Sequence, residues 1–80
     1  MSKDEIAQRI IQHLTKVAPQ AGEINQDSSL IDGGVLDSVR LIGLVAFLER
    51  TEGVNIKDED IMPSHFTSVR TIADLVEKLK

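Results

Sequence analysis

The sequence predicts an all-α fold, a bundle of three main helices and one short helix, with a long loop after the first helix. Apolar residues recur at helical spacing in three segments, and no segment shows the two-residue alternation of a half-buried strand. The length of 80 residues corresponds to a single domain, residues 1–80. Phe47 and Phe66 are the only aromatic residues, so the small core must be built from Leu, Ile and Val.

The first main helix is expected over residues 3–17. Ser2 and Glu5 have the spacing of a capping box at its start, and Pro19 cannot comfortably continue the helix beyond its end. The apolar residues that recur at helical spacing along this segment are Ile6, Ile10, Leu14 and Val17.

A long loop is expected over residues 18–37, which are rich in Gly, Asn, Asp and Ser. A loop of this length is usually functional or disordered, but its apolar residues favour an ordered loop that packs onto the helices. No Lys or Arg occurs between residues 17 and 39, which predicts an acidic surface that helps to select a basic partner. The acidic residues of this surface are Glu23, Asp27, Asp32 and Asp37.

The second main helix is expected over residues 38–51, with Gly53 as its stop. It is more apolar than a surface helix requires, because two apolar stripes run along it on different sides. One stripe consists of Leu41, Leu44, Val45 and Leu48. The other, here called the docking strip, consists of Val39, Ile42 and Ala46. Deep burial of the whole helix and exposure of the docking strip to a partner, framed by Arg40 and Arg50, are both open.

The last third of the chain predicts a short helical turn and a final helix. The turn is expected on either side of Pro63, in the segment of residues 54–67, which contains the acidic triplet at residues 58–60. The final helix is expected over residues 69–79, capped by Thr67 or Ser68. Its inner stripe consists of Val69, Ile72, Leu75, Val76 and Leu79.

Composition excludes several functional classes. The chain has no cysteine, so disulfides, thiolate metal sites and a cysteine nucleophile are excluded. A formal net charge of −4 and a pI of about 5.0 argue against nucleic-acid binding. The apolar runs are far shorter than a membrane span, and the polar N-terminus is unlike a secretion signal, so a cytoplasmic location is expected.

Asp37 and Ser38 stand where the apolar pattern of the second main helix begins. A serine in the first turn of a helix lies among backbone N–H groups that have no intrahelical partner, at the positive end of the helix dipole. This position favours a phosphate group. The alternative is that Asp37 or Ser38 only caps the helix, because both residue types are preferred there.

The order of these elements resembles that of the acyl carrier and peptidyl carrier proteins over nearly the whole chain. The run Gly34–Val39 (GVLDSV) is similar to their attachment motif, and Phe66–Ile72 (FTSVRTI) is similar to the run that opens their last helix. The resemblance implies an acyl-carrier-like four-helix bundle in which a phosphopantetheinyl transferase attaches the 4′-phosphopantetheine of coenzyme A to Ser38. The thiol of this arm would carry an acyl or aminoacyl group as a thioester, Asp37 would support the attachment, and the carrier would not be an enzyme.

Two departures from the carriers of fatty-acid synthesis narrow the resemblance. Gly34 stands four residues before Ser38, one more than is usual there, and this spacing resembles free-standing D-alanyl and other aminoacyl carriers. The charge on the second main helix is close to balance, which argues against docking through an acid-rich helix. The further partners implied are an acyl- or aminoacyl-adenylating ligase and a downstream acyltransferase or synthase. The expected docking residues are Val39, Arg40, Ile42, Ala46 and Arg50.

Two other functions stay open. A helical module could bind its partners without a covalent group, with Ser38 only a helix cap. A small hydrolase could use Ser38 with His13 or His65, although no Gly-x-Ser-x-Gly elbow surrounds the serine. These histidines are expected on the outer side of the first helix and in a loop, and two isolated histidines do not predict a metal site.

Overall fold

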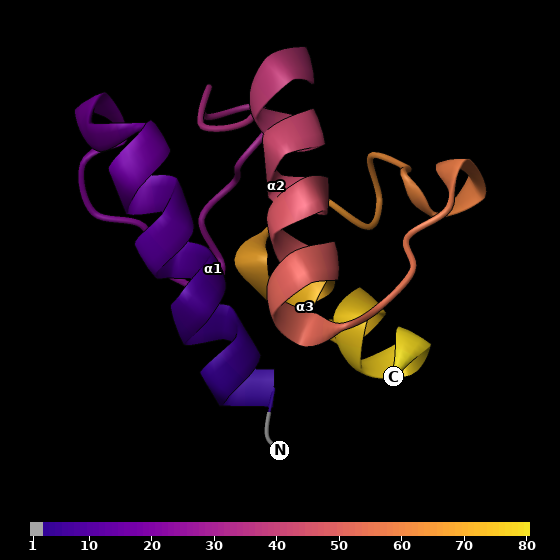
Figure 1. Cartoon of the computed structure of the whole chain (residues 1–80). Helices are drawn as coiled ribbons and strands as arrows, with labels where there is room; N and C mark the ends of the chain where they lie inside the picture. Colours follow the sequence, from indigo (N-terminus) through magenta and orange to yellow (C-terminus); the bar gives the residue numbers. More distant parts are fainter. Residues whose placement is uncertain (1–2) are drawn as a thin grey trace.

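The computed structural model describes residues 3–80 and confirms the all-α fold class (Figure 1). Three α-helices form the bundle, and the described residues contain no strand. In chain order the elements, with η marking a 3₁₀ turn, are α1 (Lys3–Val17), η1 (Pro19–Ala21), α2 (Ser38–Glu52), η2 (Asp58–Asp60) and α3 (Val69–Leu79). The one short helix that the sequence predicts is therefore only a 3₁₀ turn, η2. The other 3₁₀ turn, η1, lies in the segment that the sequence predicts to be a loop.

α1 has the bounds that the apolar periodicity predicts, while Ser2 of the expected capping box lies outside the described residues. Its apolar side packs along α3 and also contacts α2. Ile6, Ile10 and Leu14 are buried in these contacts. Val17 is exposed and does not belong to the core, because Ala18, four residues after Leu14, takes the buried position at the end of α1.

The ends of α2 and α3 follow the sequence signals. Gly53 ends α2 in the left-handed conformation, with φ of 70°, which glycine adopts without steric cost. Ser68, and not Thr67, caps α3, because its hydroxyl accepts the Thr71 N–H at 3.3 Å. The Thr71 hydroxyl in turn accepts the Ser68 N–H at 3.1 Å, which completes a reciprocal capping box.

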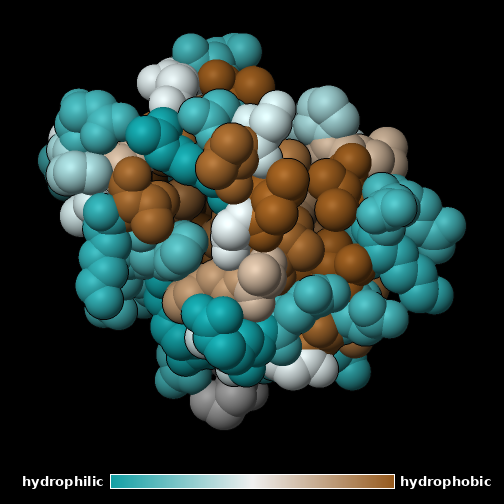
Figure 2. Space-filling model, turned by 45° about the horizontal axis from the view of Figure 1, so that its top comes forward, coloured by the Kyte–Doolittle hydropathy of each residue, from teal (hydrophilic) through white to brown (hydrophobic). Residues whose placement is uncertain are grey.

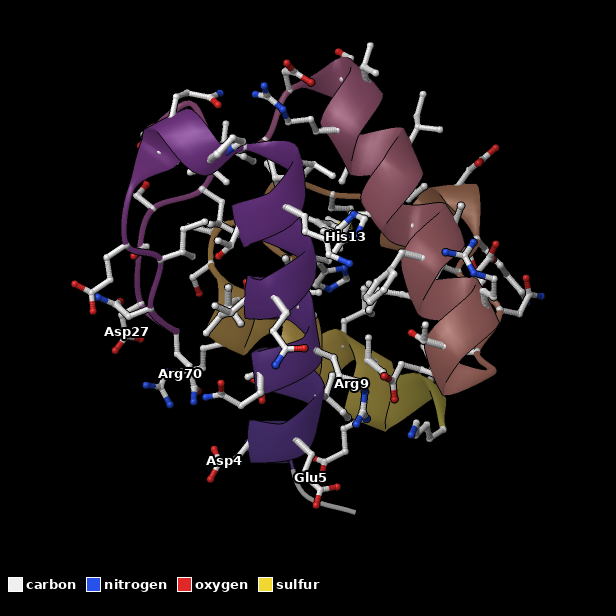
Figure 3. All side chains as sticks on the ribbon, turned by 60° about the vertical axis from the view of Figure 1, so that its left-hand side comes forward. Asp4, Glu5, Arg9, His13, Asp27 and Arg70 are labelled. Carbon is white, nitrogen blue, oxygen red and sulfur yellow. The ribbon has the colours of Figure 1, made fainter. Side chains whose placement is uncertain are left out.

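The long loop between α1 and α2 is ordered, as its apolar residues predict. The Leu30 N–H donates to the Thr67 carbonyl at 2.8 Å, and the Arg70 N–H donates to the Gln26 carbonyl at 2.9 Å. The Arg70 guanidinium also donates two hydrogen bonds to the Asp27 carboxylate, at 2.7 and 3.0 Å (Figure 3). These contacts fix the loop against the start of α3.

The core is aliphatic apart from Phe66, which is buried. Phe47 is only partly buried and packs against the outside of the core. Side chains from all three helices and from the long loop meet there. The buried side chains with the largest volumes are Phe66, Ile6, Ile10, Leu14, Leu30, Leu44, Leu48, Ile72, Val69 and Val76. Because the loop residue Leu30 is among them, loop and helices share one core, and the position of the loop fixes where α2 begins.

Candidate functional site

Asp37 is the N-cap of α2 and Ser38 is its first residue. The extended backbone of Asp37 (φ −127°, ψ −174°) aims its carboxylate at the first turn, where Oδ1 accepts the Arg40 N–H at 2.8 Å. Its Oδ2 lies 3.7 Å from the Arg40 guanidinium. Ser38 is exposed, and its hydroxyl has no hydrogen-bond partner among residues 3–80. Capping is thus performed by Asp37, and the Ser38 hydroxyl stays available.

The loop that leads into α2 holds these two residues in place through a tight turn. The Val35 and Leu36 N–H groups both donate to the Leu30 carbonyl, at 2.8 and 3.0 Å. Gly33 is required in this turn, because an added Cβ would lie 2.4 Å from the Ser29 carbonyl oxygen. Val35 and Leu36 are buried, so the turn is anchored in the core immediately before the exposed pair Asp37–Ser38.

An apolar hollow opens beside Ser38. It has a volume of about 260 Å³, and its lining residues are Ile31, Leu36, Asp37, Ser38, Leu41 and Phe66. The N–H groups of Ser38 and Val39, in the first turn of α2, have no recorded backbone partner in the described part of the chain. An exposed hydroxyl, unpaired backbone donors and the positive end of the α2 dipole together suit a phosphate ester at Ser38.

The docking strip is exposed, which excludes deep burial of the whole α2 helix. Val39 is 78% exposed and Ile42 is 70% exposed, and Ala46 is exposed as well. Figure 2 shows apolar side chains gathered on the end of the molecule at the top of Figure 1, where α2 begins. Two other large apolar side chains that the sequence patterns do not single out, Ile31 and Met62, are also exposed.

The two cations expected to frame the docking strip have different surroundings. Arg40 is half-buried and lies over the Asp37 carboxylate, so it is linked to the attachment pair. Arg50 is exposed and forms no ion pair within residues 3–80. The expected site residues therefore lie on α2 or at its N-cap. Arg50 lies more than three turns along the helix from Asp37–Ser38, near its other end.

The histidines do not form a nucleophilic site with Ser38. His13 is half-buried and stacks on Phe47, so its expected place on the outer side of α1 is wrong; the helical pattern could not show that Phe47 of α2 covers it. His65 lies in the expected loop and donates from Nδ1 to the Asp60 carbonyl at 2.8 Å. Residues 3–80 contain no group of three His, Asp or Glu side chains placed to hold a metal ion. Nor is any helix in this range long and apolar enough to cross a membrane.

Comparison with known proteins identifies the family. The family model described as phosphopantetheine attachment site matches residues 6–79, which is nearly the whole chain. The chain therefore belongs to the phosphopantetheine-attachment family of acyl and peptidyl carrier proteins. Domains of this family carry a covalently attached 4′-phosphopantetheine and are not themselves catalytic.

Among solved structures, the chain is similar to a chain in a crystal structure described as that of a FAD-dependent dehydrogenase. The two chains are 33% identical with a TM-score of 0.74, and the alignment covers 90% of this chain and 99% of the other. The matched chain is thus about as long as this one, and the similarity concerns the whole carrier-like fold. A search of curated sequences finds no match.

Proposed function

We propose that this chain is a carrier protein that is modified at Ser38 and presents an acyl or aminoacyl thioester to partner enzymes. The observation that carries the proposal is the division of roles at the start of α2. Asp37 satisfies the helix cap, and within residues 3–80 the exposed Ser38 hydroxyl is left without a partner beside unpaired backbone donors. The 4′-phosphopantetheine, once attached, supplies the thiol that a cysteine-free chain lacks.

The residues around Ser38 suggest how the arm is attached and supported. A phosphopantetheinyl transferase would need the Ser38 hydroxyl accessible, and the structure of the loop keeps it at the surface. Asp37 would hold the first turn of α2 in place, because its carboxylate bonds the Arg40 N–H. The apolar hollow beside Ser38 would shelter part of the arm or its cargo.

The docking strip is proposed as the contact for partners that load or use the arm. Its exposed apolar side chains, Val39, Ile42 and Ala46, fit a small transient interface with Arg40 and Arg50 at the rim. The proposed partners are an acyl- or aminoacyl-adenylating ligase and a downstream acyltransferase or synthase. We place this single carrier domain, residues 1–80, in the cytoplasm and in aminoacyl or specialised acyl metabolism, in line with the spacing between Gly34 and Ser38.

The test is the intact mass of the chain after incubation with coenzyme A and a promiscuous phosphopantetheinyl transferase. We expect a gain of one phosphopantetheinyl group, and none in Ser38→Ala. The substitution should change the free energy of unfolding by less than about 1 kcal/mol, because Asp37 keeps the cap. Ser64→Ala, at another exposed serine, is the matched control and should be modified normally.

The alternative, a non-covalent interaction module, makes the opposite prediction for this measurement. It expects no mass gain in the unaltered chain under conditions that modify an established carrier. A mass gain that persists in Ser38→Ala would contradict the assignment of the attachment site, but it would not affect the assignment of the chain to the family.

A further inference from the structure

A second hollow lies between α1 and α2. It has a volume of about 270 Å³, and its lining residues are Arg9, Gln12, His13, Lys16, Phe47 and Thr51. We call it the α1–α2 groove. At a rise of about 1.5 Å per residue, Phe47 lies roughly 13 Å along α2 from Ser38, so an occupant of this groove leaves Ser38 uncovered.

The lining of the α1–α2 groove combines the aromatic rings of His13 and Phe47 with the charged side chains of Arg9 and Lys16. His13 reaches from α1 toward α2 (Figure 3). Its ring stacks on that of Phe47, with centroids 4.3 Å apart and an interplanar angle of 19°. Burial, together with the positive charges of Arg50 and Lys16, lowers the pKa of His13, so its ring is neutral at pH 7. The stacked pair offers a flat surface to an apolar or aromatic side chain of a partner.

The rim of the groove is positive, although the chain as a whole has a net charge of −4. Lys16 and Arg50 are exposed, and neither forms an ion pair within the described residues. Lys16 lies on α1 with His13, Arg50 lies on α2 with Phe47, and both positive charges lower the pKa of the His13 ring. Arg9 differs from them, because its guanidinium is already held by two hydrogen bonds to Glu52, at 2.6 and 3.0 Å.

We propose that the α1–α2 groove binds an acidic segment of a partner protein, with an apolar or aromatic side chain in the hollow and carboxylates against Lys16 and Arg50. Charge complementarity selects this occupant, because a basic segment would be repelled by two unpaired cations and a neutral segment would leave both unpaired. The groove adds a second contact surface to the proposed carrier. Its occupation does not depend on the modification of Ser38, and it shares only Arg50 with the rim proposed for the docking strip.

The test is a titration of the ¹⁵N-labelled full chain, followed by NMR, with the acetylated and amidated peptide Glu-Asp-Phe-Glu-Asp. We expect saturable shift changes confined to residues 9–16 and 47–51 that weaken with added salt. Lys16→Gln and Arg50→Gln should each weaken binding by about threefold to fivefold. Lys57→Gln removes an exposed cation outside the groove and should leave binding unchanged.

Several results would overturn the proposal. One is that the neutral peptide Gln-Asn-Phe-Gln-Asn binds as tightly as the acidic peptide. Others are that the shift changes do not saturate or are centred outside the groove. A further one is that Lys57→Gln weakens binding as much as Lys16→Gln does. Sedimentation tests whether the chain binds a second copy of itself. Self-association that is lost in Lys16→Gln would identify that second copy as the occupant of the groove instead. Lys16→Gln should still accept phosphopantetheine, as measured by intact mass. Its weakened peptide binding would then be independent of the modification at Ser38. If the unaltered chain binds the acidic peptide but accepts no phosphopantetheine, only the proposed function fails.

Discussion

Asp37 caps α2 and Ser38 does not, a difference that their residue types alone could not show. Both types are preferred N-caps, so the sequence leaves either as the cap. The backbone of Asp37 decides the matter, because its extended conformation brings the carboxylate to the Arg40 N–H. The position of the pair at a helix start was predictable from the apolar periodicity that begins at Val39. The availability of the Ser38 hydroxyl was not, because it depends on which neighbour completes the cap.

Two glycines near the site have opposite structural roles, which gives a prediction at the scale of single residues. Gly43 lies within α2, and an added Cβ would meet nothing within 4 Å. Gly43→Ala should therefore raise the free energy of unfolding by about 0.5–1 kcal/mol, the usual gain of Ala over Gly inside a helix. Gly33→Ala should lower it, because the added Cβ would collide with the Ser29 carbonyl.

Urea unfolding of both variants, followed by circular dichroism, measures these changes. A destabilised Gly43→Ala would contradict the open surroundings of this residue. A Gly33→Ala variant as stable as the unaltered chain would show that the turn before Asp37 can relax.

At the scale of elements, the bounds of the three helices were largely predictable, because apolar spacing, Gly53 and Ser68 mark them. The contact between the long loop and α3 was not, since Asp27 and Arg70 stand 43 residues apart in the chain. This contact revises the acidic surface expected for the loop. Asp27 is paired with Arg70, and Asp37 is occupied as the cap of α2. Within residues 3–80, Glu23 and Asp32 are the members of this surface that form no ion pair.

The exposed face of α2 leads to a prediction for the helix as a docking element. Ile42→Asp should leave the helical content and the stability nearly unchanged, because Ile42 is largely exposed and contributes little to the core. It should slow loading by the cognate ligase more than Arg40→Glu does, since it would place a charge in the desolvated centre of the contact. The measurement is the loading rate of the modified chain, with circular dichroism as the check on folding.

Ala46→Asp serves as a second variant of the docking strip, and Thr15→Asp, at an exposed position of α1, is the matched control. Both docking-strip variants should load slowly, and the control should load normally. If Ile42→Asp and Ala46→Asp load as fast as the unaltered chain, partners do not dock through this face of α2.

At the scale of the whole molecule, one buried carboxylate joins all three helices. The side chain of Glu52, at the end of α2, is only 1% exposed. Arg9 of α1 donates two hydrogen bonds to it, and the Lys80 ammonium, just after α3, lies 3.1 Å from Oε1. The sequence does not reveal this cluster, because the helical pattern places Glu52 among surface residues and the partners come from both ends of the chain. It closes the bundle at the end opposite Ser38.

This cluster should make stability depend on pH in a defined direction. The hydrogen bonds from Arg9, and further those from Lys80, hold the pKa of Glu52 below its ordinary value of 4.5. A carboxylate with a lowered pKa stabilises the folded state above its unfolded pKa, and that stabilisation is lost as pH falls through the folded value. Glu52→Gln should therefore lower the free energy of unfolding near pH 7 by about 1–2 kcal/mol, a range that allows for solvent screening at the partly exposed Arg9.

Urea unfolding at a series of pH values tests this expectation. The stability difference between the unaltered chain and Glu52→Gln should be constant above about pH 5 and should shrink as the pH falls below 4.5, the ordinary pKa of a glutamate. Glu59→Gln, at an exposed acid of η2 that forms no ion pair within residues 3–80, should show no such dependence. A Glu52→Gln difference that is the same at every pH would mean that packing at this end of the bundle, and not the charge of Glu52, holds the three helices together.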